Sequence, residues 1–324
     1  MSIFITGSLA YDRVMNFPGT FGDYIIPDKI HMLNVCFPIG NLEEKRGGTG
    51  GNIAYNLAML GEKSRILTSV GKDFGSYKFY LEKIGVNLDG LNIAGNEFTA
   101  GAYITTDKHA NQITGFHAAA MTIPCAYKFP ALSAAEDIGI IAPTNTTDMT
   151  SHAAYYRENG IRFIFDPGQQ ITSLSGEELI CGITGAMLLI SNDYELELIC
   201  KLTGLDLEGI LKLTPVVITT LGEKGSRIVR RGGGESMVPA MPINSLENPT
   251  GAGDSYRAGL IKGILNSLSL EESAAIGAAC AAFCVEKYGT QEHYYDAASL
   301  GAKYKAGTGK ELPISFTPLV QQQN

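Results

Sequence analysis

Short apolar runs alternate along the chain with segments whose apolar residues recur at helical spacing. The apolar runs carry few charges, which is typical of strands buried on both faces of a parallel sheet. This alternation of strand and helix predicts a doubly wound α/β fold with a mostly parallel sheet. Predicted strands occupy residues 3–6, 66–70, 138–142, 163–165, 187–190 and 216–220, and predicted helices occupy residues 52–60, 77–84, 149–159, 176–181 and 194–203.

Two stretches interrupt this alternation. Residues 14–46 and 98–117 are rich in turn residues and alternate in polarity, as antiparallel strands do. We interpret them as a second, smaller sheet that forms a lid over a site. The chain is then divided into an α/β core of residues 1–13, 47–97 and 118–312, a β lid of residues 14–46 and 98–117, and a loose tail of residues 313–324.

The charge balance narrows the classes of partner. The 324 residues include 25 Lys and Arg against 33 Asp and Glu, a net charge of −8. Such a surface disfavours nucleic-acid binding, which needs clustered positive charge. The N-terminus lacks the pattern of a signal peptide. The most apolar helical stretch, residues 274–285, is shorter than the ~20 residues of a membrane span. We therefore expect a cytoplasmic protein that binds neither nucleic acid nor membranes.

The six cysteines show no CxxC spacing. Reduced core thiols in a cytosolic protein explain them better than a disulfide framework or a metal site. The five histidines likewise show no ligand spacing, and we assign none of them a role.

Glycine is over-represented, with 38 residues in 324, against a usual share of roughly 7 %. The cluster at residues 46–52 does not match the dinucleotide fingerprint, because the third glycine counted from Gly48 falls at Ile53. Both Gly-Lys pairs are followed by an acidic residue, so a P-loop is excluded as well. What remains is a cluster whose small residues let a ligand touch the main chain, or a tight turn.

A second glycine cluster leads into a helix that we expect to run to about residue 266. Gly251, Ala252 and Gly253 leave backbone N–H groups free at its N-terminus, where the helix dipole favours an anion such as phosphate. Asp254 lies in the first turn. It is either an ordinary helix-start acid or a base that accepts the proton of a hydroxyl group attacking the phosphate.

These motifs, in this order and spacing, resemble those of the ribokinase-like (PfkB) kinases over the chain to about residue 300. The resemblance rests on residues 47–52, 71–86 and 251–254. Further segments look most like those of bacterial adenosine kinases, at residues 7–21, 115–121, 166–170, 192–195 and 289–292. The resemblance implies a three-layer α/β/α core with a small β-sheet lid. It also implies ATP-dependent phosphorylation of the 5′-hydroxyl of a ribonucleoside, foremost adenosine to AMP in purine salvage.

The resemblance also assigns roles to single residues. Asp254 would be the catalytic base, and the N–H groups of Gly251, Ala252 and Gly253 would hold the charge that develops on the γ-phosphoryl group. The nucleoside pocket would comprise Asp12 on the ribose diol, Ser8, Gly48 and Asn52 beside it, Phe116 on the purine face, and Met121, Gln169 and Gln170 around the base. ATP would lie along Thr220, Gly222 and Gly225, and Asn192 and Glu195 would position phosphate and hold Mg²⁺ through water.

Several of these residues also have plain structural explanations. Asn192 and Glu195 suit the cap and first turn of a helix. The others suit a turn (Ser8 and Asp12), the core of the lid (Phe116) or a solvated loop (Gln169 and Gln170).

Two positions depart from the family pattern. Asn248 stands where the family usually has Asp near a monovalent-cation site; it keeps the oxygen but loses the charge, which weakens the expectation of K⁺. Ala102 stands where the adenosine kinases carry a second stacking aromatic residue, which weakens the expectation of strict adenosine specificity. Arg257, one turn after Asp254, either touches phosphate or pairs with a nearby acid.

Rival functions remain open at this point. One is a kinase of the same fold that acts on ribose, a fructose-type sugar, guanosine, inosine or cytidine. Another is a nucleoside-binding protein without catalysis, which the intact Asp254 and its glycines argue against. The failed fingerprint disfavours an NAD oxidoreductase. The resemblance also implies a homodimer joined through the lids, because a lid sheet with one apolar face needs cover.

Overall fold

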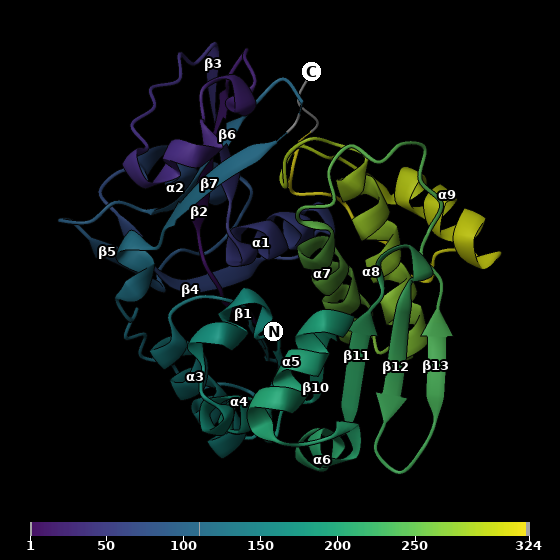
Figure 1. Cartoon of the computed structure of the whole chain (residues 1–324). Helices are drawn as coiled ribbons and strands as arrows, with labels where there is room; N and C mark the ends of the chain where they lie inside the picture. Colours follow the sequence, from purple (N-terminus) through teal and green to yellow (C-terminus); the bar gives the residue numbers. More distant parts are fainter. Residues whose placement is uncertain (1, 110, 322–324) are drawn as a thin grey trace.

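A nine-stranded sheet forms the centre of the structure, a computed structural model that describes residues 2–109 and 111–321 (Figure 1). The strand order is β13-β12-β11-β10-β9-β8-β1-β4-β5. The strands from β11 to β5 in this order run parallel, and β12 and β13 add an antiparallel edge. The strands are β1 (Ile3–Thr6), β4 (Ser64–Gly71), β5 (Leu91–Ala94), β8 (Ile138–Ile141), β9 (Arg162–Phe165), β10 (Leu188–Asn192), β11 (Val216–Thr220), β12 (Ser226–Arg230) and β13 (Glu235–Val238).

Neighbouring residues of a strand point to opposite faces of the sheet. Since successive residues of these strands are apolar, both faces of the sheet are apolar. In β1, Ile3 and Ile5 belong to one hydrophobic cluster and Phe4 to the other. The cluster of Ile3 includes residues of α1 (Thr49–Met59), α2 (Gly75–Lys83), α7 (Ala252–Leu265), α8 (Leu270–Val285) and α9 (Ala297–Thr308). The cluster of Phe4 includes residues of α3 (Thr146–Glu158), α4 (Gly176–Ile183), α5 (Asp193–Thr203) and α6 (Leu207–Leu213). The three-layer α/β/α core expected from the sequence is confirmed.

The order of the strands reverses between β1 and β8. The chain passes from β1 to β4 and β5 on one side, and then builds β8, β9, β10 and β11 on the other. Just beyond the two strand ends, the Ser8 N–H donates to the Pro143 carbonyl oxygen at 3.0 Å. In open α/β sheets, ligands bind beyond the carboxyl ends of the strands at such a reversal. The topology therefore places a ligand site above Ser8 and Pro143.

A four-stranded sheet stands beside this edge; it is built largely from the segments expected to form the lid, and we refer to it by that name. Its order is β3-β2-β6-β7, with antiparallel outer pairs and a parallel central pair. Exposed apolar side chains lie on β3 (Leu42) and on the segment between β2 and β3 (Ile30 and Met32). They are the kind of surface that the expected homodimer would cover; the dimer itself stays a prediction. The strands are β2 (Ala10–Asn16), β3 (Asn41–Gly47), β6 (Ala100–Thr106) and β7 (Gln112–His117).

The division into core, lid and tail stays a prediction, but the structure differs from it at two places. Strand β2 begins at Ala10, four residues before the expected start of the lid. The expected tail is not loose where it is described: Val320 is buried, and the Leu319 N–H donates to the Ala58 carbonyl oxygen at 2.8 Å. The apolar side chains of the segment pack on the core, and this packing outweighs its irregular pattern. Residues 322–324 lie outside the described part.

Helices α7 and α8 pack closely where two glycines face each other. A Cβ added to Gly259 would lie 2.6 Å from the Cα of Gly277, and one added to Gly277 would lie 2.5 Å from the Tyr256 carbonyl oxygen. The backbones therefore touch without intervening side chains. This contact fixes the position of α7, whose N-terminus carries Gly251 and Asp254.

Two further expectations concern the cysteines and membrane-spanning helices. All six cysteines lie in the described part of the chain and are free, and Cys125, Cys280 and Cys284 are buried. Among the described helices, none combines the length and apolar character needed to cross a bilayer.

Candidate active site

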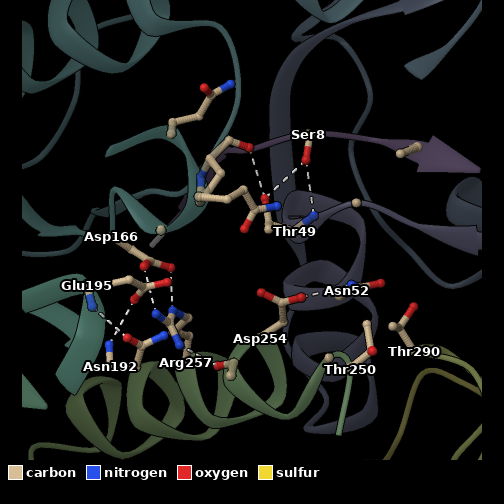
Figure 2. Close-up of a pocket in the computed structure, with 18 of the residues that line it drawn as sticks. Ser8, Thr49, Asn52, Asp166, Asn192, Glu195, Thr250, Asp254, Arg257 and Thr290 are labelled. Atoms are coloured by element: carbon tan, nitrogen blue, oxygen red, sulfur yellow. Dashed lines mark hydrogen bonds and ion pairs between the residues drawn. The ribbon is translucent and has the colours of Figure 1, made fainter. Parts of the chain in front are cut away.

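A cleft of about 1220 Å³ lies between the carboxyl ends of the core strands and the lid (Figure 2). It collects residues from both sheets and from the N-termini of α1, α5 and α7. Gly225 alone among the expected site residues does not line it. A Cβ added to Gly225 would lie 2.0 Å from the Val238 carbonyl oxygen, so a close backbone contact next to β13 explains this glycine. The expected residues that line the cleft are Ser8, Asp12, Gly48, Asn52, Phe116, Met121, Gln169, Gln170, Asn192, Glu195, Thr220, Gly222, Gly251, Ala252, Gly253 and Asp254.

The N-terminus of α7 opens onto the cleft with its backbone N–H groups uncapped by any side chain. Gly251 is the N-cap, with φ +86°, a conformation that other residues rarely adopt. By contrast, Asn145 and Asn192 cap α3 and α5 with their side chains. The Ala252 N–H makes a long hydrogen bond of 3.3 Å to the Pro249 carbonyl oxygen. With no side-chain cap, the helix dipole and the N–H groups of this turn suit the end of α7 to bind an anion.

Asp254 lies beside these N–H groups in the first turn of α7. The residue is half-buried and lines the cleft, and its carboxylate accepts a 2.8 Å hydrogen bond from the Asn52 amide. Desolvation raises the pKa of Asp254 to about 7, although the Asn52 hydrogen bond and the Arg257 charge oppose the rise. A carboxylate with a pKa near neutrality is suited to take up a proton during a reaction at physiological pH.

Arg257 pairs with an acid rather than reaching freely into the cleft. Its Nε and Nη2 atoms donate to the two carboxylate oxygens of Asp166, the second at 2.7 Å. Both side chains are buried. The remaining Nη1 donates to the Gly253 carbonyl oxygen at 3.0 Å. The pair therefore joins the end of β9 to the first turn of α7.

Asn192 and Glu195 form a reciprocal capping box at the start of α5. The Asn192 side-chain oxygen accepts the Glu195 N–H at 2.7 Å, and Glu195 Oε2 accepts the Asn192 N–H at 2.8 Å. The plain structural role is therefore present, yet both side chains also line the cleft. Burial raises the pKa of Glu195. Its other oxygen is of the kind that Mg²⁺ prefers as a ligand, so the residues fit a hydrated cation held next to the anion site.

Three lid residues face the cleft in one row. Asp12 of β2 lies opposite Ala102 of β6, which lies opposite Phe116 of β7, so the three side chains share one face of the lid sheet. Burial raises the pKa of Asp12. Phe116 is 59 % exposed, so its ring is available to a ligand rather than buried in the lid.

Ser8 and Gly48 shape the floor of the cleft at the start of α1. Ser8 Oγ accepts the Thr49 N–H at 3.2 Å, and Thr49 Oγ1 donates to the Pro143 carbonyl oxygen at 3.0 Å. A Cβ added to Gly48 would lie 2.5 Å from the Ser8 carbonyl oxygen. On the far wall, the Gln170 amide donates to the Thr144 carbonyl oxygen at 2.8 Å. This bond orients the Gln170 side chain within the cleft.

Sequence reasoning missed the partners that hold these groups. Asp166 belongs to a segment quoted for the resemblance, but nothing local indicates that it pairs with Arg257, 91 positions away. Gln291 also lies in a quoted segment, and its contact with Asn52 spans 239 positions. Both contacts depend on how distant segments fold together.

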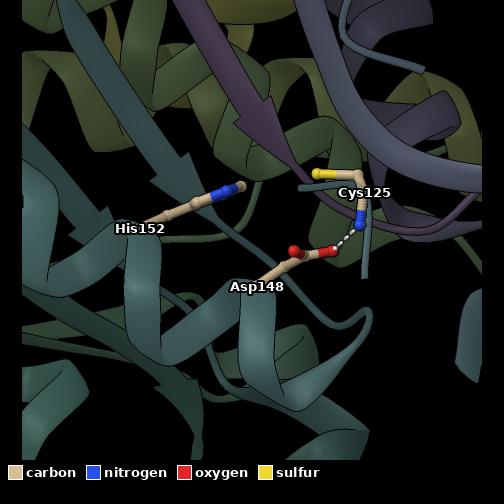
Figure 3. Close-up of side chains that lie close together, drawn as sticks. All are labelled: Cys125, Asp148 and His152. Carbon is tan, nitrogen blue, oxygen red and sulfur yellow. Dashed lines mark hydrogen bonds between the residues drawn. The ribbon is translucent and has the colours of Figure 1, made fainter. Parts of the chain in front are cut away.

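The fold also gathers Cys125, Asp148 and His152 outside the cleft, with one ligand-type atom of each within 4.8 Å of the others (Figure 3). Asp148 Oδ2 accepts the Cys125 N–H, and His152 Nδ1 is hydrogen bonded to Thr6 Oγ1, both at 2.8 Å. Burial and the neighbouring Asp148 raise the pKa of Cys125 to about 12, so it is a thiol. Asp148 is therefore bound to Cys125 and His152 to Thr6, and these contacts tie α3 to the segment after residue 122 and to β1.

This cluster carries a prediction about acid stability. Burial lowers the pKa of His152 to about 4, so the native state stays neutral where the unfolded chain takes up a proton. Stability from this residue is complete above about pH 6.5 and is lost as the pH falls toward 4. When the pH falls from 7 to 5, the unfolding free energy of the unaltered protein should decrease because of His152. In His152→Gln, we expect this decrease to be smaller by about 2 kcal/mol.

Denaturant unfolding at the two pH values measures this difference. His31, which is exposed, provides the matched control, and His31→Gln is measured in the same way. Parallel pH dependences for His152→Gln and the unaltered protein would contradict the prediction.

Comparisons with known proteins agree with this geometry. Residues 23–297 match the model of the "pfkB family carbohydrate kinase". The chain is 29% identical over 297 residues to a nucleoside kinase of Methanothermobacter thermautotrophicus, covering 90% of this chain and 95% of the relative. It is 32% identical over 272 residues to a nucleoside kinase of Methanocaldococcus jannaschii, covering 83% and 89%.

A solved structure resembles the whole chain. The nucleoside kinase of Burkholderia thailandensis, in complex with inosine, is similar with a TM-score of 0.82 and 30% identity, covering 96% of this chain and 99% of that protein. The same kinase in complex with ADP-inosine is similar with a TM-score of 0.80 and 31% identity, covering 96% and 97%.

Proposed function

Because the chain belongs to the pfkB family of carbohydrate kinases, we propose that it transfers the γ-phosphoryl group of ATP to the 5′-hydroxyl of a ribonucleoside, with adenosine preferred. One observation carries the proposal. The uncapped N-terminus of α7 and the half-buried Asp254 open onto the same cleft as Asp12 and Phe116 of the lid. A single ligand with a diol, a hydroxyl group and an aromatic base would reach all of them.

Asp254 is the proposed base. A hydroxyl group attacks phosphorus more readily as its proton leaves, and a carboxylate within hydrogen-bonding distance receives that proton. Because Asp254 has one oxygen bound to the Asn52 amide, the other is left for the 5′-hydroxyl. The Asn52 hydrogen bond therefore supports the proposal that the second Asp254 oxygen is the one that takes the proton.

The N–H groups of Gly251, Ala252 and Gly253 are the proposed anion hole. The transferring phosphoryl group carries charge on its equatorial oxygens, and fixed N–H donors stabilise that charge without reorganising. The Arg257 bond to the Gly253 carbonyl oxygen supports this role, because it holds the peptide that follows the glycine turn in place.

ATP is proposed to lie along Asn192, Thr220 and Gly222, which line the far end of the cleft. Glu195 and Asn192 would hold Mg²⁺ through water, and the ion would neutralise phosphate charge during transfer. K⁺ stays a weak expectation: the Asn248 side-chain oxygen carries no charge and already accepts the Thr250 N–H at 2.8 Å.

A nucleoside kinase of wider base range is the second candidate. Ala102 leaves one side of the base position without a stacking ring, and the similar Burkholderia thailandensis kinase binds inosine. A coupled ADP-release assay with adenosine, inosine, guanosine, cytidine and ribose separates the candidates. The adenosine proposal requires the highest kcat/KM for adenosine, and the wider proposal requires values within about tenfold for several bases. Turnover of ribose alone would contradict both.

The contact of Asp12 with the ribose diol makes a separate prediction. Asp12→Asn removes the charge from the acceptor, and hydrogen bonds to charged groups contribute about 1.5–3 kcal/mol. We expect KM for adenosine to rise about 10–100-fold with kcat changed little, as measured by initial rates.

The substrate provides the control for this prediction. With 2′-deoxyadenosine, which lacks part of the diol, the effect of Asp12→Asn should shrink. Equal effects on both substrates would place the Asp12 contact elsewhere.

A further inference from the structure

A buried series of hydrogen bonds runs from Asp254 to the backbone at the end of β3. The Asn52 amide donates to Asp254 at 2.8 Å, and the Gln291 Nε2 atom donates to Asn52 Oδ1 at 3.0 Å. The same Nε2 atom donates to the Tyr77 hydroxyl at 2.6 Å, which donates to the Gly47 carbonyl oxygen at 3.0 Å. Asn52, Gln291 and Tyr77 are each at most 4 % exposed.

At the Gly47 end of this hydrogen-bond series, donor and acceptor can be assigned in only one way. A backbone carbonyl can accept but never donate, so the Tyr77 proton is committed to Gly47. The Tyr77 oxygen then offers Gln291 only an acceptor, and Gln291 must present its NH₂ group. That NH₂ group also faces Asn52, which must therefore present its oxygen to Gln291 and its NH₂ group to Asp254.

The arrangement leaves one polar atom unsatisfied. Gln291 Oε1 is buried and has no hydrogen-bond partner among the described residues. A flipped Gln291 would place its NH₂ group where Oε1 now lies and would turn its oxygen toward Asn52 and Tyr77. The Gln291 amide keeps its present orientation although its oxygen has no partner. This indicates that the donors and acceptors of the hydrogen-bond series determine the orientation more strongly than the need to satisfy Oε1 does.

We propose that Gln291 is a positioning residue of the catalytic site, which acts through Asn52 to present Asp254 with a donor and so keeps the base ionised. The inference rests on the proposed function for its kinetic consequence, but the orientation of Asn52 is independent of it. The other charged or titratable groups around Asp254 are Arg257 on α7, Asp166 after β9, Glu195 on α5 and Cys284 on α8. None of them is hydrogen bonded to the Asn52 amide, whose side-chain partners are Asp254 and Gln291.

Gln291→Glu tests the proposal. The new carboxylate accepts only, so the Asn52 amide turns its NH₂ group toward position 291 and its oxygen toward Asp254. Asp254 then loses its donor and holds its proton more tightly. We expect the acidic limb of the kcat/KM profile to move up by about one pH unit, which means about a tenfold loss of kcat/KM at pH 6 and a smaller loss at pH 9.

Two further variants keep the test falsifiable if the first folds poorly. Gln291→Met removes the donor without adding charge, and Tyr77→Phe removes the hydroxyl that fixes the Gln291 amide. Both should move the acidic limb in the same direction by a smaller amount. A loss of kcat/KM that is the same at every pH in all three variants would reduce Gln291 to a structural residue and overturn the proposal.

A second readout separates this proposal from the proposed function. NMR titration of carboxyl-labelled aspartate, with Asp254→Asn used for assignment, follows Asp254 without any substrate. If no nucleoside is turned over but the Asp254 titration still moves up in Gln291→Glu, the proposed function fails and the positioning role stands. If turnover is observed and the titration does not move, the positioning role fails alone.

Discussion

Replacing Asp254 by asparagine should lower kcat for nucleoside phosphorylation about 10³-fold, the scale on which a general base contributes. Asparagine keeps the shape of the side chain and can still accept the Asn52 hydrogen bond, but it cannot take the proton of the 5′-hydroxyl. Nucleoside affinity should stay within a fewfold, because the lid and the cleft floor are untouched. Residual activity within tenfold of the unaltered enzyme would rule out Asp254 as the base.

The same substitution should make the protein more stable. Burial raises the pKa of Asp254 to about 7 in the folded state, so the ionised carboxylate destabilises the fold at high pH. Stability from such a group is present below the unfolded pKa of about 3.9 and is lost as the pH rises through 7. We expect Asp254→Asn to raise the unfolding free energy by about 3–4 kcal/mol at pH 8 and by less at pH 5.

Thermal or denaturant unfolding at both pH values checks this second effect, independently of any substrate. An equal gain at pH 5 and pH 8 would mean that Asp254 is not the titrating group. Together, the two measurements ask whether the residue that limits stability is also the residue that carries catalysis.

Replacing Arg257 by methionine should destabilise the protein by about 3–5 kcal/mol, because it leaves the buried Asp166 carboxylate without its partner. Methionine retains most of the volume, so the loss comes from the uncompensated charge rather than from a cavity. Denaturant unfolding measures the loss at pH 7.

An exposed ion pair of the same chemistry provides the control. Arg230 pairs with Glu271 at 2.7 Å, with 32% and 41% of the two side chains exposed, and exposed pairs contribute roughly 0–1 kcal/mol. Arg230→Met should therefore cost little. Adding Asp166→Leu to Arg257→Met should recover much of the loss, and a double variant as unstable as the single one would show that the charge is not the cause.

The local parts of the site were predictable because their chemistry depends on residues that are neighbours in the sequence. Gly251 to Asp254 form one turn, so the sequence alone predicts an uncapped helix start next to a carboxylate. The core strands were predictable for a similar reason: β1 is apolar at every position except its last, as a strand covered on both faces must be. By contrast, β12, the strand next to the β13 edge, carries Arg227 and Arg230, and its pattern gave no comparable signal.

The supporting parts could not be predicted, because they depend on contacts between distant segments. Sequence reasoning left Arg257 between phosphate and an acid, and only the fold brings it to Asp166. It assigned no role to Gln291, whose meaning depends on the direction of a hydrogen bond from Tyr77. His152 received no role because its neighbours Cys125 and Thr6 are far away in the chain. The roles assigned to the cleft residues themselves stay predictions until the variants are measured.

The glycine contact between α7 and α8 has a consequence for how mutational data on this protein should be interpreted. Gly259 and Gly277 lie outside the cleft, yet any side chain at either position would push α7 away from α8. In a saturation-mutagenesis experiment scored by growth or turnover, both positions should tolerate substitution as poorly as Asp254 does. If residues were assigned to the active site by their intolerance to substitution alone, the whole interface between α7 and α8 would be included by mistake. The two classes separate only when abundance is scored beside activity, because the glycine variants lose folded protein and the Asp254 variants do not.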